Sequence, residues 1–230
     1  ERVATLSWNT YAHLEAYFGV PVAGGVVHPL NLRLHPSDIA YIVNHAQDKI
    51  LIVDDVLLGL YEAIRPHVRL ERVLVVPLTG QPVPEGLESY EDFLATGDEG
   101  FAYPELSEQE AAGMCYTSGT TGKPKGVVYS HRSIALHSLG SALPDALNLS
   151  SRDVLLPVVP MFHVLAWGLP YTGVMTGCKL VLPGPHLDAV SLLDLFEAEG
   201  VNKTAGVPTI WLGVLQALEK EPTRWRLRPM

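Results

Sequence analysis

Short apolar runs bounded by charged or turn-forming residues recur along the chain and predict buried β-strands. The segments with this form are 3–8, 49–53, 72–76, 111–116, 154–158 and 179–182. Continuous apolar runs, rather than strict alternation of apolar and polar residues, are typical of parallel strands that are covered on both faces. The pattern therefore predicts a sheet that lies inside the protein.

Segments with helical features separate these runs. Residues 11–20 predict one helix, and a second begins at Pro36, because proline is favoured in the first turn of a helix. Apolar residues then recur at intervals of three and four: Ile39, Ile42, Val43 and Ala46. Further helices are predicted near 133–143 and after Asp188, whose carboxylate can cap a helix N-terminus.

Strands that alternate with helices predict an α/β fold with a largely parallel sheet in layers flanked by helices. The segment 77–86 contains three prolines and two glycines and predicts a surface connection. The segment 104–110 is the best candidate for a linker between two subdomains.

The most unusual local composition lies at residues 117–126, which read Thr-Ser-Gly-Thr-Thr-Gly-Lys-Pro-Lys-Gly. Glycines let the backbone approach a ligand closely, and consecutive N–H groups that point inward form an anion-binding concavity. Lysine adds a point charge suited to phosphate. The segment predicts a loop that binds polyphosphate.

Two nucleotide-binding loops of similar composition do not fit this segment. In the P-loop pattern G-x-x-x-x-G-K-[ST], Pro124 would occupy the second glycine position counted from Gly119. The dinucleotide pattern G-x-G-x-x-G is absent from the sequence. A merely flexible surface loop is the remaining alternative. The buried-strand pattern before the segment, its two lysines and the apolar residues 127–129 after it argue against that alternative.

Composition and charge narrow the class of protein. With 47% hydrophobic and 18% charged residues among 230, the chain can form a sizeable core. A net charge of −9 argues against nucleic acid or an anionic membrane as the main partner, because both require a basic surface. Local positive charge is nevertheless present at the loop, in Lys123, Lys125, His131 and Arg132.

Other potential sites are weaker. Cys115 and Cys178 lie in apolar runs and are predicted to be buried free thiols in a reducing compartment. No apolar run reaches the ~20 residues that a membrane-spanning helix needs. His131 and His137 are six positions apart, and no carboxylate or cysteine completes a zinc site with them.

The sequence YTSGTTGKPKG at 116–126 resembles the phosphate-binding signature of the adenylate-forming enzymes. These include acyl-CoA synthetases, firefly luciferase and the adenylation domains of peptide synthetases. Residues 159–164, VPMFHV, resemble a second substrate-pocket motif of the family, and 205–209, AGVPT, a later strand-to-helix element. Upstream, the segments 31–34 and 39–45 are also similar, although a proline is usual where Leu32 stands. The resemblance spans nearly the whole chain and is closest to medium- and long-chain fatty acyl-CoA synthetases.

The resemblance implies part of the large N-terminal domain of an adenylate-forming enzyme, without the family's C-terminal domain. Residues 1–106 would form an N-terminal α/β subdomain, incomplete at its start. Residues 107–230 would form a second α/β subdomain with the phosphate loop and acyl pocket, incomplete at its end. The Mg²⁺-binding glutamate, the ribose-binding aspartate and the lysine of the C-terminal domain are expected outside the chain. The triplet at 96–98 has the letters of the ribose motif but precedes the loop, so we predict a turn there.

The resemblance also implies the roles of individual residues. Lys125 and His163 would be catalytic, and the Thr117 hydroxyl would help to hold Mg²⁺. Trp167 and Gly206 would belong to the acyl pocket, although His163 and Trp167 also suit a purely structural role in a core. The residues that would bind the nucleotide are Thr117, Ser118, Gly119, Thr120, Thr121, Gly122, Lys125, His163 and Val164.

The implied activity is the ATP-dependent conversion of a fatty acid to acyl-AMP, followed by thioesterification to CoA. ATP and Mg²⁺ are the implied cofactors and CoA the co-substrate; the 230 residues alone are expected to be inactive. The alternatives are a non-catalytic module that binds ATP or an acyl group, and a ligase for an aryl or other short acid. The expected location is the cytoplasm, and a homodimer or peripheral membrane contact is compatible with the sequence.

Overall fold

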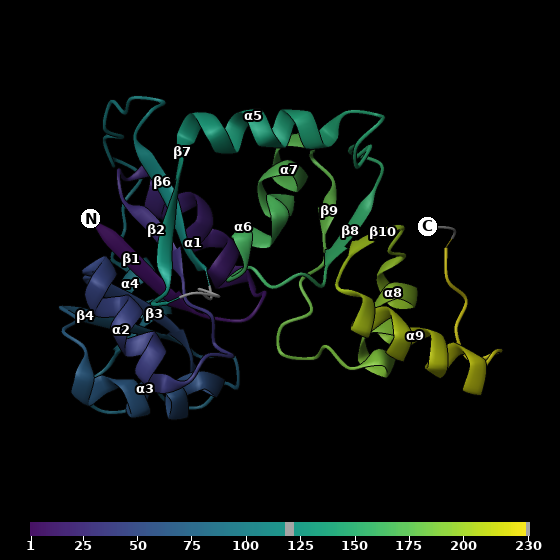
Figure 1. Cartoon of the computed structure of the whole chain (residues 1–230), viewed down its shortest axis with the longest axis horizontal. Helices are drawn as coiled ribbons and strands as arrows, with labels where there is room; N and C mark the ends of the chain where they lie inside the picture. The colour runs from purple at the N-terminus through teal and green to yellow at the C-terminus, as the bar shows by residue number, and fades with distance from the viewer. Residues whose placement is uncertain (118–121, 229–230) are drawn as a thin grey trace. The chain divides into compact units, whose positions relative to one another are not determined.

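Seven strands of the described residues form one sheet, in the order β5-β4-β3-β1-β2-β6-β7 (Figure 1). The computed structural model describes residues 1–117 and 122–228. The elements of this part are β1 (Arg2–Leu6), α1 (Tyr11–Val22), β2 (Val26–Pro29), α2 (Pro36–Ala46), β3 (Ile50–Asp54), η1 (Asp55–Leu57), α3 (Leu58–Ile64), η2 (Arg65–His67), β4 (Arg72–Val76), β5 (Glu88–Ser89), α4 (Tyr90–Ala95), β6 (Ala111–Thr117) and β7 (Lys125–Ser130).

The strands of this sheet are parallel except at one edge. β1 pairs in parallel with both β2 and β3, and β3 pairs in parallel with β4. At the other side β2 pairs with β6, and β7 runs antiparallel to β6. The α/β class and the four strands predicted in this half of the chain are confirmed, whereas β2 lies near the middle of the sheet without having been predicted.

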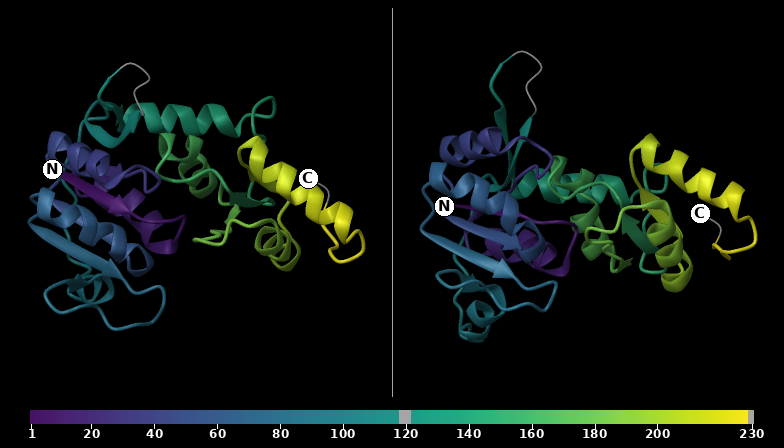
Figure 2. Two further views of the ribbon diagram at one scale, coloured as in Figure 1. Left: turned by 60° about the horizontal axis from the view of Figure 1, so that its bottom comes forward. Right: turned by 90° about the horizontal axis from the view of Figure 1, so that it is seen from below.

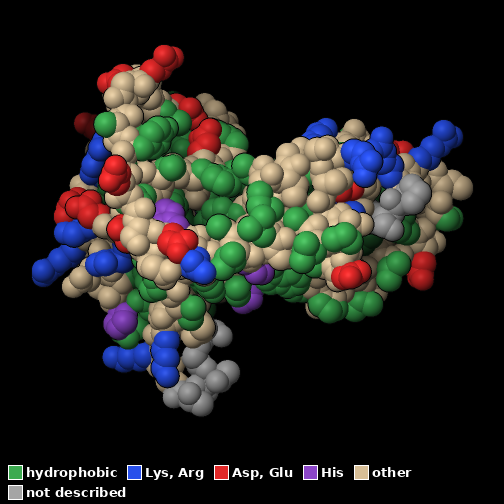
Figure 3. All heavy atoms as spheres, turned by 90° about the horizontal axis from the view of Figure 1, so that it is seen from above, with side chains coloured by type: hydrophobic (Ala, Val, Ile, Leu, Met, Phe, Trp, Pro, Cys, Tyr) green, Lys and Arg blue, Asp and Glu red, His purple; other side chains and the backbone are tan. Residues whose placement is uncertain are grey.

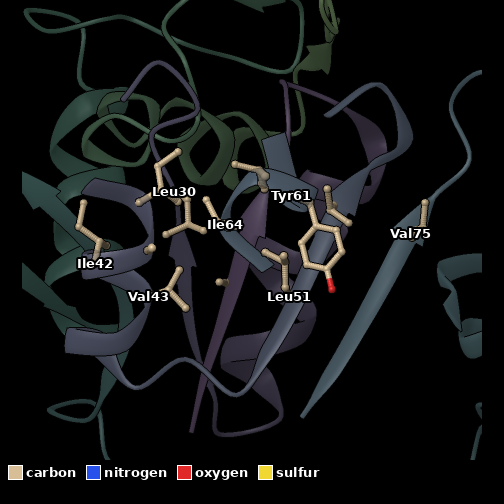
Figure 4. Close-up of a cluster of buried hydrophobic side chains, with 12 residues drawn as sticks. Leu30, Ile42, Val43, Leu51, Tyr61, Ile64 and Val75 are labelled. Carbon is tan, nitrogen blue, oxygen red and sulfur yellow. The ribbon is translucent and has the colours of Figure 1, made fainter. Parts of the chain in front are cut away.

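The side chains of successive strand residues pack against helices on opposite faces of the sheet, as the strand period of two requires. On one face, β-strand residues such as Leu51, Val53 and Val75 pack with residues of α2 and α3 (Figure 4). On the other face, Ile52 and Leu74 pack with residues of α1 and α4. All four residues placed at helical spacing after Pro36 are buried.

A smaller parallel sheet, in the order β10-β8-β9, follows later in the chain (Figure 2). Residues of α8 and α9 pack with β8 on one side, and Leu169 of α7 packs with Leu155 of β8 in a separate cluster. Asp188 caps α8 by accepting a hydrogen bond from the Ser191 N–H at 3.0 Å, as predicted. The elements are α5 (His131–Ala142), β8 (Val154–Pro157), α6 (Val164–Trp167), α7 (Leu169–Thr176), β9 (Lys179–Leu180), α8 (Ala189–Glu199), β10 (Lys203–Ala205) and α9 (Pro208–Lys220).

The described chain divides into two units by its internal contacts. Unit 1 comprises Glu1–Trp8 and Ala12–Arg132, and unit 2 comprises Asn9–Tyr11 and Ser133–Met230. The division predicted at 106/107 falls within unit 1, where β6 continues the large sheet. The assignment of 107–230 to a separate subdomain of the whole protein stays a prediction. None of the helices described here is long and apolar enough to cross a lipid bilayer.

A buried histidine attaches α1 to β1 inside unit 1. His13 Nδ1 lies 2.9 Å from the carbonyl oxygen of Trp8, and Nε2 lies 2.8 Å from Thr5 Oγ1. Because a carbonyl only accepts, Nδ1 carries the hydrogen, and neutral Nε2 accepts from the threonine hydroxyl. Burial lowers the pKa of His13 to about 4, although its hydrogen bond to Trp8 opposes this shift.

This histidine predicts a pH-dependent stability. The folded-state pKa lies below the unfolded value of 6.5, so the unfolded chain binds the extra proton between these values. The contribution of neutral His13 to the free energy of unfolding is complete above pH 6.5 and is lost as the pH falls toward 4. Relative to His13→Gln, the wild-type free energy of unfolding should fall by about 3 kcal/mol between about pH 7.5 and pH 4. Chemical unfolding of both proteins across this range measures the difference, and parallel pH curves would contradict the assignment.

Candidate functional site

The candidate phosphate loop joins the two antiparallel strands β6 and β7 of unit 1. Thr117 pairs with Lys125, and Tyr116 with Gly126, so the two ends of the signature lie opposite each other. The Thr117 hydroxyl donates a long hydrogen bond of 3.4 Å to the Lys125 carbonyl oxygen. Strand pairing therefore brings together two residues predicted to contact the nucleotide.

The described end of the loop carries exposed positive charge. Gly122 has a φ of 156°, and Lys123 Nζ lies 5.0 Å from the centre of the Tyr41 ring. In the described part of the chain, the lysines that form ion pairs are Lys49 and Lys179, which leaves the ammonium groups of Lys123 and Lys125 without a carboxylate partner. The predicted ligands Ser118, Gly119, Thr120 and Thr121 lie outside the described residues.

Tyr116 anchors the strand that leads into the loop. Its hydroxyl and His45 Nδ1 are 2.7 Å apart, which joins the end of β6 to α2. Its ring also lies against β7, where a Cβ on Gly126 would meet the ring carbons at 3.2 Å. A side chain at 126 would therefore have to displace the Tyr116 ring by a few tenths of an ångström. Burial raises the pKa of Tyr116, so its hydroxyl remains protonated and can donate to His45.

A fully buried histidine–aspartate pair lies behind Tyr116. His28 Nδ1 is 2.8 and 3.0 Å from the two carboxylate oxygens of Asp48, and both side chains have no exposed surface. The centre of the His28 ring is 5.2 Å from that of Tyr116. His28 Nε2 has no hydrogen-bond partner among the described residues. Sequence reasoning missed this pair, because β2 and the segment between α2 and β3, which contains Asp48, come together only in the folded sheet.

In unit 2, the two other motifs meet at one edge of the small sheet. β8 and β10 are parallel, and the segment containing His163 follows β8 as Gly206 follows β10. The N–H groups of Val158 and Val159 both donate to the Ala205 carbonyl oxygen, at 2.9 and 3.0 Å. The carboxyl ends of parallel strands are the usual location of ligand sites in such sheets.

Local packing explains why residue 206 is a glycine. A Cβ at this position would lie 2.8 Å from the ring of Trp211, whose Nε1 donates to the Gly206 carbonyl oxygen at 3.1 Å. A larger side chain would therefore displace Trp211 or the backbone between β10 and α9. A substrate contact for Gly206 stays a prediction.

A buried asparagine fixes the segment between β8 and His163. Asn9 Nδ2 donates to the carbonyl oxygens of Pro157 and Val159 at 2.9 and 3.0 Å, and Oδ1 accepts from the Met161 N–H at 2.8 Å. One side chain thus bonds to three backbone groups of this segment. Sequence reasoning missed Asn9, because its partners lie about 150 residues away along the chain.

The four residues after His163 form a left-handed turn, α6. Their φ angles are 48° at Val164, 50° at Leu165 and Ala166, and 56° at Trp167. For L-amino acids this conformation costs about 1–2 kcal/mol per residue, because Cβ approaches the following carbonyl oxygen. The burial of Leu165 and Ala166, which are 3% and 0% exposed, offsets part of this cost.

The turn leaves three predicted site residues at the surface of unit 2. His163 is exposed, and Val164 and Trp167 are each 42% exposed. The exposure of Trp167 argues against a role in core packing alone, since a tryptophan with that role would be buried. Lys125 belongs to unit 1 and His163 to unit 2.

A groove of about 720 Å³ between α1 and α4 of unit 1 contains none of the predicted site residues. It is lined mainly by apolar residues such as Ala16, Ile52 and Leu74. Two charged groups at its edge have partners: Glu15 accepts from the Tyr90 hydroxyl, and Arg72 pairs with Glu88.

The family model for AMP-binding enzymes matches residues 1–228. The chain belongs to the AMP-binding enzyme family. It is 53% identical over 219 residues to a long-chain-fatty-acid–CoA ligase of Thermus thermophilus, covering 95% of this chain and 40% of that protein. It is 52% identical over 218 residues to a 3-methylmercaptopropionyl-CoA ligase of Ruegeria pomeroyi, covering 93% and 40%. The chain thus spans about 40% of the length of these relatives.

The fold of this AMP-binding chain also matches solved structures of the family. A long-chain-fatty-acid–CoA ligase from Archaeoglobus fulgidus superposes with a TM-score of 0.84 at 25% identity, over 96% of this chain and 42% of that one. The mixed α/β fold with a mostly parallel sheet is therefore that of adenylate-forming CoA ligases, as the sequence predicted.

The hydrogen bond between Tyr116 and His45 should stabilise the base of the loop. We expect Tyr116→Phe to lower the free energy of unfolding by about 1 kcal/mol, the net contribution of one hydrogen bond. Tyr129→Phe on the neighbouring strand is the matched control, because the Tyr129 hydroxyl bonds to no described residue. Urea unfolding of both variants measures the effect, and equal stability of the two would show that the bond contributes nothing.

Proposed function

We propose that the protein containing this chain is an ATP-dependent acyl-CoA ligase that activates a fatty acid as its acyl adenylate. Membership of the AMP-binding family and relatives with about 50% identity that are named CoA ligases support this proposal. The observation that carries it is the β6–β7 hairpin, which places the Thr117 hydroxyl opposite Lys125 at the two ends of the signature loop.

The proposed reaction has two steps. A carboxylate oxygen of the acid attacks the α-phosphorus of ATP, and the bond to pyrophosphate breaks. The thiolate of CoA then attacks the acyl carbon, and AMP leaves. The protein's contribution to the first step is mainly positioning and neutralisation of charge, because the phosphoryl chemistry needs little covalent help. No residue of this chain is assigned to CoA.

Each end of the loop has a role in the first step. The Lys125 ammonium, which has no carboxylate partner among the described residues, would neutralise the negative charge that develops on pyrophosphate. The Thr117 hydroxyl fits an Mg²⁺ site, since it is an oxygen ligand whose one hydrogen bond to a described residue is 3.4 Å long. Bound Mg²⁺ would supply further neutralisation of the phosphate charge.

The turn after β8, in unit 2, would provide contacts for the acyl group. His163 and Val164 are exposed at the start of the left-handed turn, where they could contact the acyl phosphate. Trp167 ends the same turn with 42% of its surface exposed, so its ring could contact an acyl chain. Gly206 follows the neighbouring strand and would belong to the wall of the same pocket.

A shorter acid is the second candidate substrate. The relative from Ruegeria pomeroyi is named for 3-methylmercaptopropionate, an acid with a short thioether chain, at almost the same identity as the fatty-acid enzyme. Fatty and short acids therefore both belong in the test. The two free cysteines, Cys115 and Cys178, are buried and support our proposal of a reducing, cytoplasmic location.

ATP–pyrophosphate exchange tests the proposal directly. We expect the whole protein to catalyse exchange with a fatty acid, and residues 1–230 alone to lack this activity. A panel of palmitate, decanoate, benzoate and 3-methylmercaptopropionate separates the candidate substrates. ATP binding without exchange for any acid would favour a non-catalytic binding module instead.

Removing either end of the loop should slow adenylation. We expect Lys125→Ala and Thr117→Ala in the whole protein to lower the rate of adenylate formation by about tenfold or more, equivalent to about 1.4 kcal/mol in the barrier. Lys49→Ala is the matched control, because Lys49 is exposed and pairs with Glu71. Wild-type rates in both loop variants would overturn the assignment of the loop.

Shortening Trp167 should change the preference among acids. We expect Trp167→Ala to raise the KM for long acids by about tenfold while kcat changes less, because a contact remote from the reacting atoms contributes binding rather than chemistry. The measurement is KM and kcat for acids from decanoate to palmitate. Unchanged KM and kcat values across these acids would indicate that Trp167 serves in packing only.

A further inference from the structure

The carbonyl group of Trp167 is held by a histidine from another helix of unit 2. His137 Nε2, on α5, lies 3.0 Å from the Trp167 carbonyl oxygen. Ser141, one helical turn later, places its Oγ 3.2 Å from the same nitrogen. Since a carbonyl oxygen only accepts, Nε2 must carry the hydrogen and donate it to the backbone of the turn.

The His137 ring also fills the space beside the next residue. A Cβ on Gly168 would lie 2.4 Å from His137 Cδ2 and 2.7 Å from Nε2. Gly168 itself has a φ of 72°, in the region that favours glycine. The ring, the glycine and the carbonyl group of Trp167 therefore fit together as one arrangement, which any side chain at 168 would disrupt.

Trp167 is the last residue of a strained segment, the turn α6. All four residues of α6 have positive φ angles, and the hydrogen bonds at the turn include those from the Ala166 N–H to the His163 carbonyl oxygen and from the Gly168 N–H to the Leu165 carbonyl oxygen, both 3.0 Å long. Neither of these bonds involves the Trp167 carbonyl group. A segment in a sparsely populated conformation persists only when its surroundings hold it there. At the end of this turn, His137 is one group that does so.

We propose that His137 is a positioning residue that sets the placement of the Trp167 ring and thereby the affinity for long acyl chains. His137 acts through the backbone of residue 167 and contacts no substrate itself. The inference rests on the proposed function, in which Trp167 contacts the acyl chain. It adds a specificity-determining residue outside the family motifs, on a helix that lies between the 116–126 signature and the 159–164 motif in the chain.

Two variants at one position separate hydrogen bonding from packing. His137→Phe keeps a ring of similar size but removes the N–H donor, whereas His137→Gln provides an amide N–H near the place of Nε2. Leu136→Ala is the matched control on the same helix, because Leu136 is 54% exposed. Hydrophobic side chains lie at the surface on the side of the molecule where α5 runs (Figure 3).

The first readout does not depend on ligase activity. In the whole protein, quenching of tryptophan fluorescence by acrylamide is compared for each variant with and without an added Trp167→Phe change, so that the difference reports Trp167 alone. We expect His137→Phe to alter the quenching constant of Trp167, and His137→Gln and Leu136→Ala to leave it at the wild-type value. Should His137→Phe fail to fold by circular dichroism, His137→Ala removes the same donor without filling the space.

The second readout is kinetic. We expect His137→Phe to raise the KM for palmitate by about fivefold, the factor expected for the loss of one net hydrogen bond, with kcat within about twofold of wild type. His137→Gln should restore the wild-type KM. Wild-type behaviour of His137→Phe in both readouts would overturn the proposal, and so would equal losses in His137→Phe and His137→Gln. Lack of adenylation by the wild-type protein would instead refute the proposed function, while the fluorescence result would still report the contact.

Discussion

The register of the β6–β7 pair is the constraint on which the candidate phosphate site depends. Because Thr117 lies opposite Lys125, the two ends of the signature segment are held together. A shift of one residue would turn every side chain of β7 to the other face of the sheet. β2 attaches β6 to the large sheet, and the Tyr116 ring packs closely against Gly126 of β7.

Buried polar groups support the segments around the phosphate loop in unit 1 and around β8 in unit 2. His13 stays neutral and uses both ring nitrogens, and Asn9 satisfies three backbone groups between β8 and Met161. His28 and Asp48 form a pair with no exposed surface behind Tyr116. A buried polar group without a partner costs more than the net gain of a hydrogen bond. These residues therefore fix the backbone where irregular segments leave the strands.

The acyl side of the candidate site depends on strain rather than on regular pairing. The left-handed turn at Val164–Trp167 places the buried side chains of Leu165 and Ala166 between two exposed side chains. A right-handed turn of the same length would arrange these four side chains differently. The turn is attached at its beginning through Pro160, whose carbonyl group accepts from the His163 N–H at 3.0 Å, and at its end through His137. The predicted contacts of His163 and Trp167 with substrate follow from this exposure.

The sequence by itself determined the α/β class, most strands and the capped helices, because apolar periodicity and capping residues are local features. Its glycine-rich signature also carries family membership, whereas phosphate binding by the loop stays a prediction. It did not predict β2, a four-residue strand that contains His28 and Pro29, because so short a run carries little periodicity. Nor did it predict the positive φ angles after His163, which Val and Trp disfavour on their own. Only the tertiary structure decided the partners of Asn9, His28 and His137. Their hydrogen bonds join residues that the folded sheets and helices bring together, and such contacts leave no local pattern in the chain.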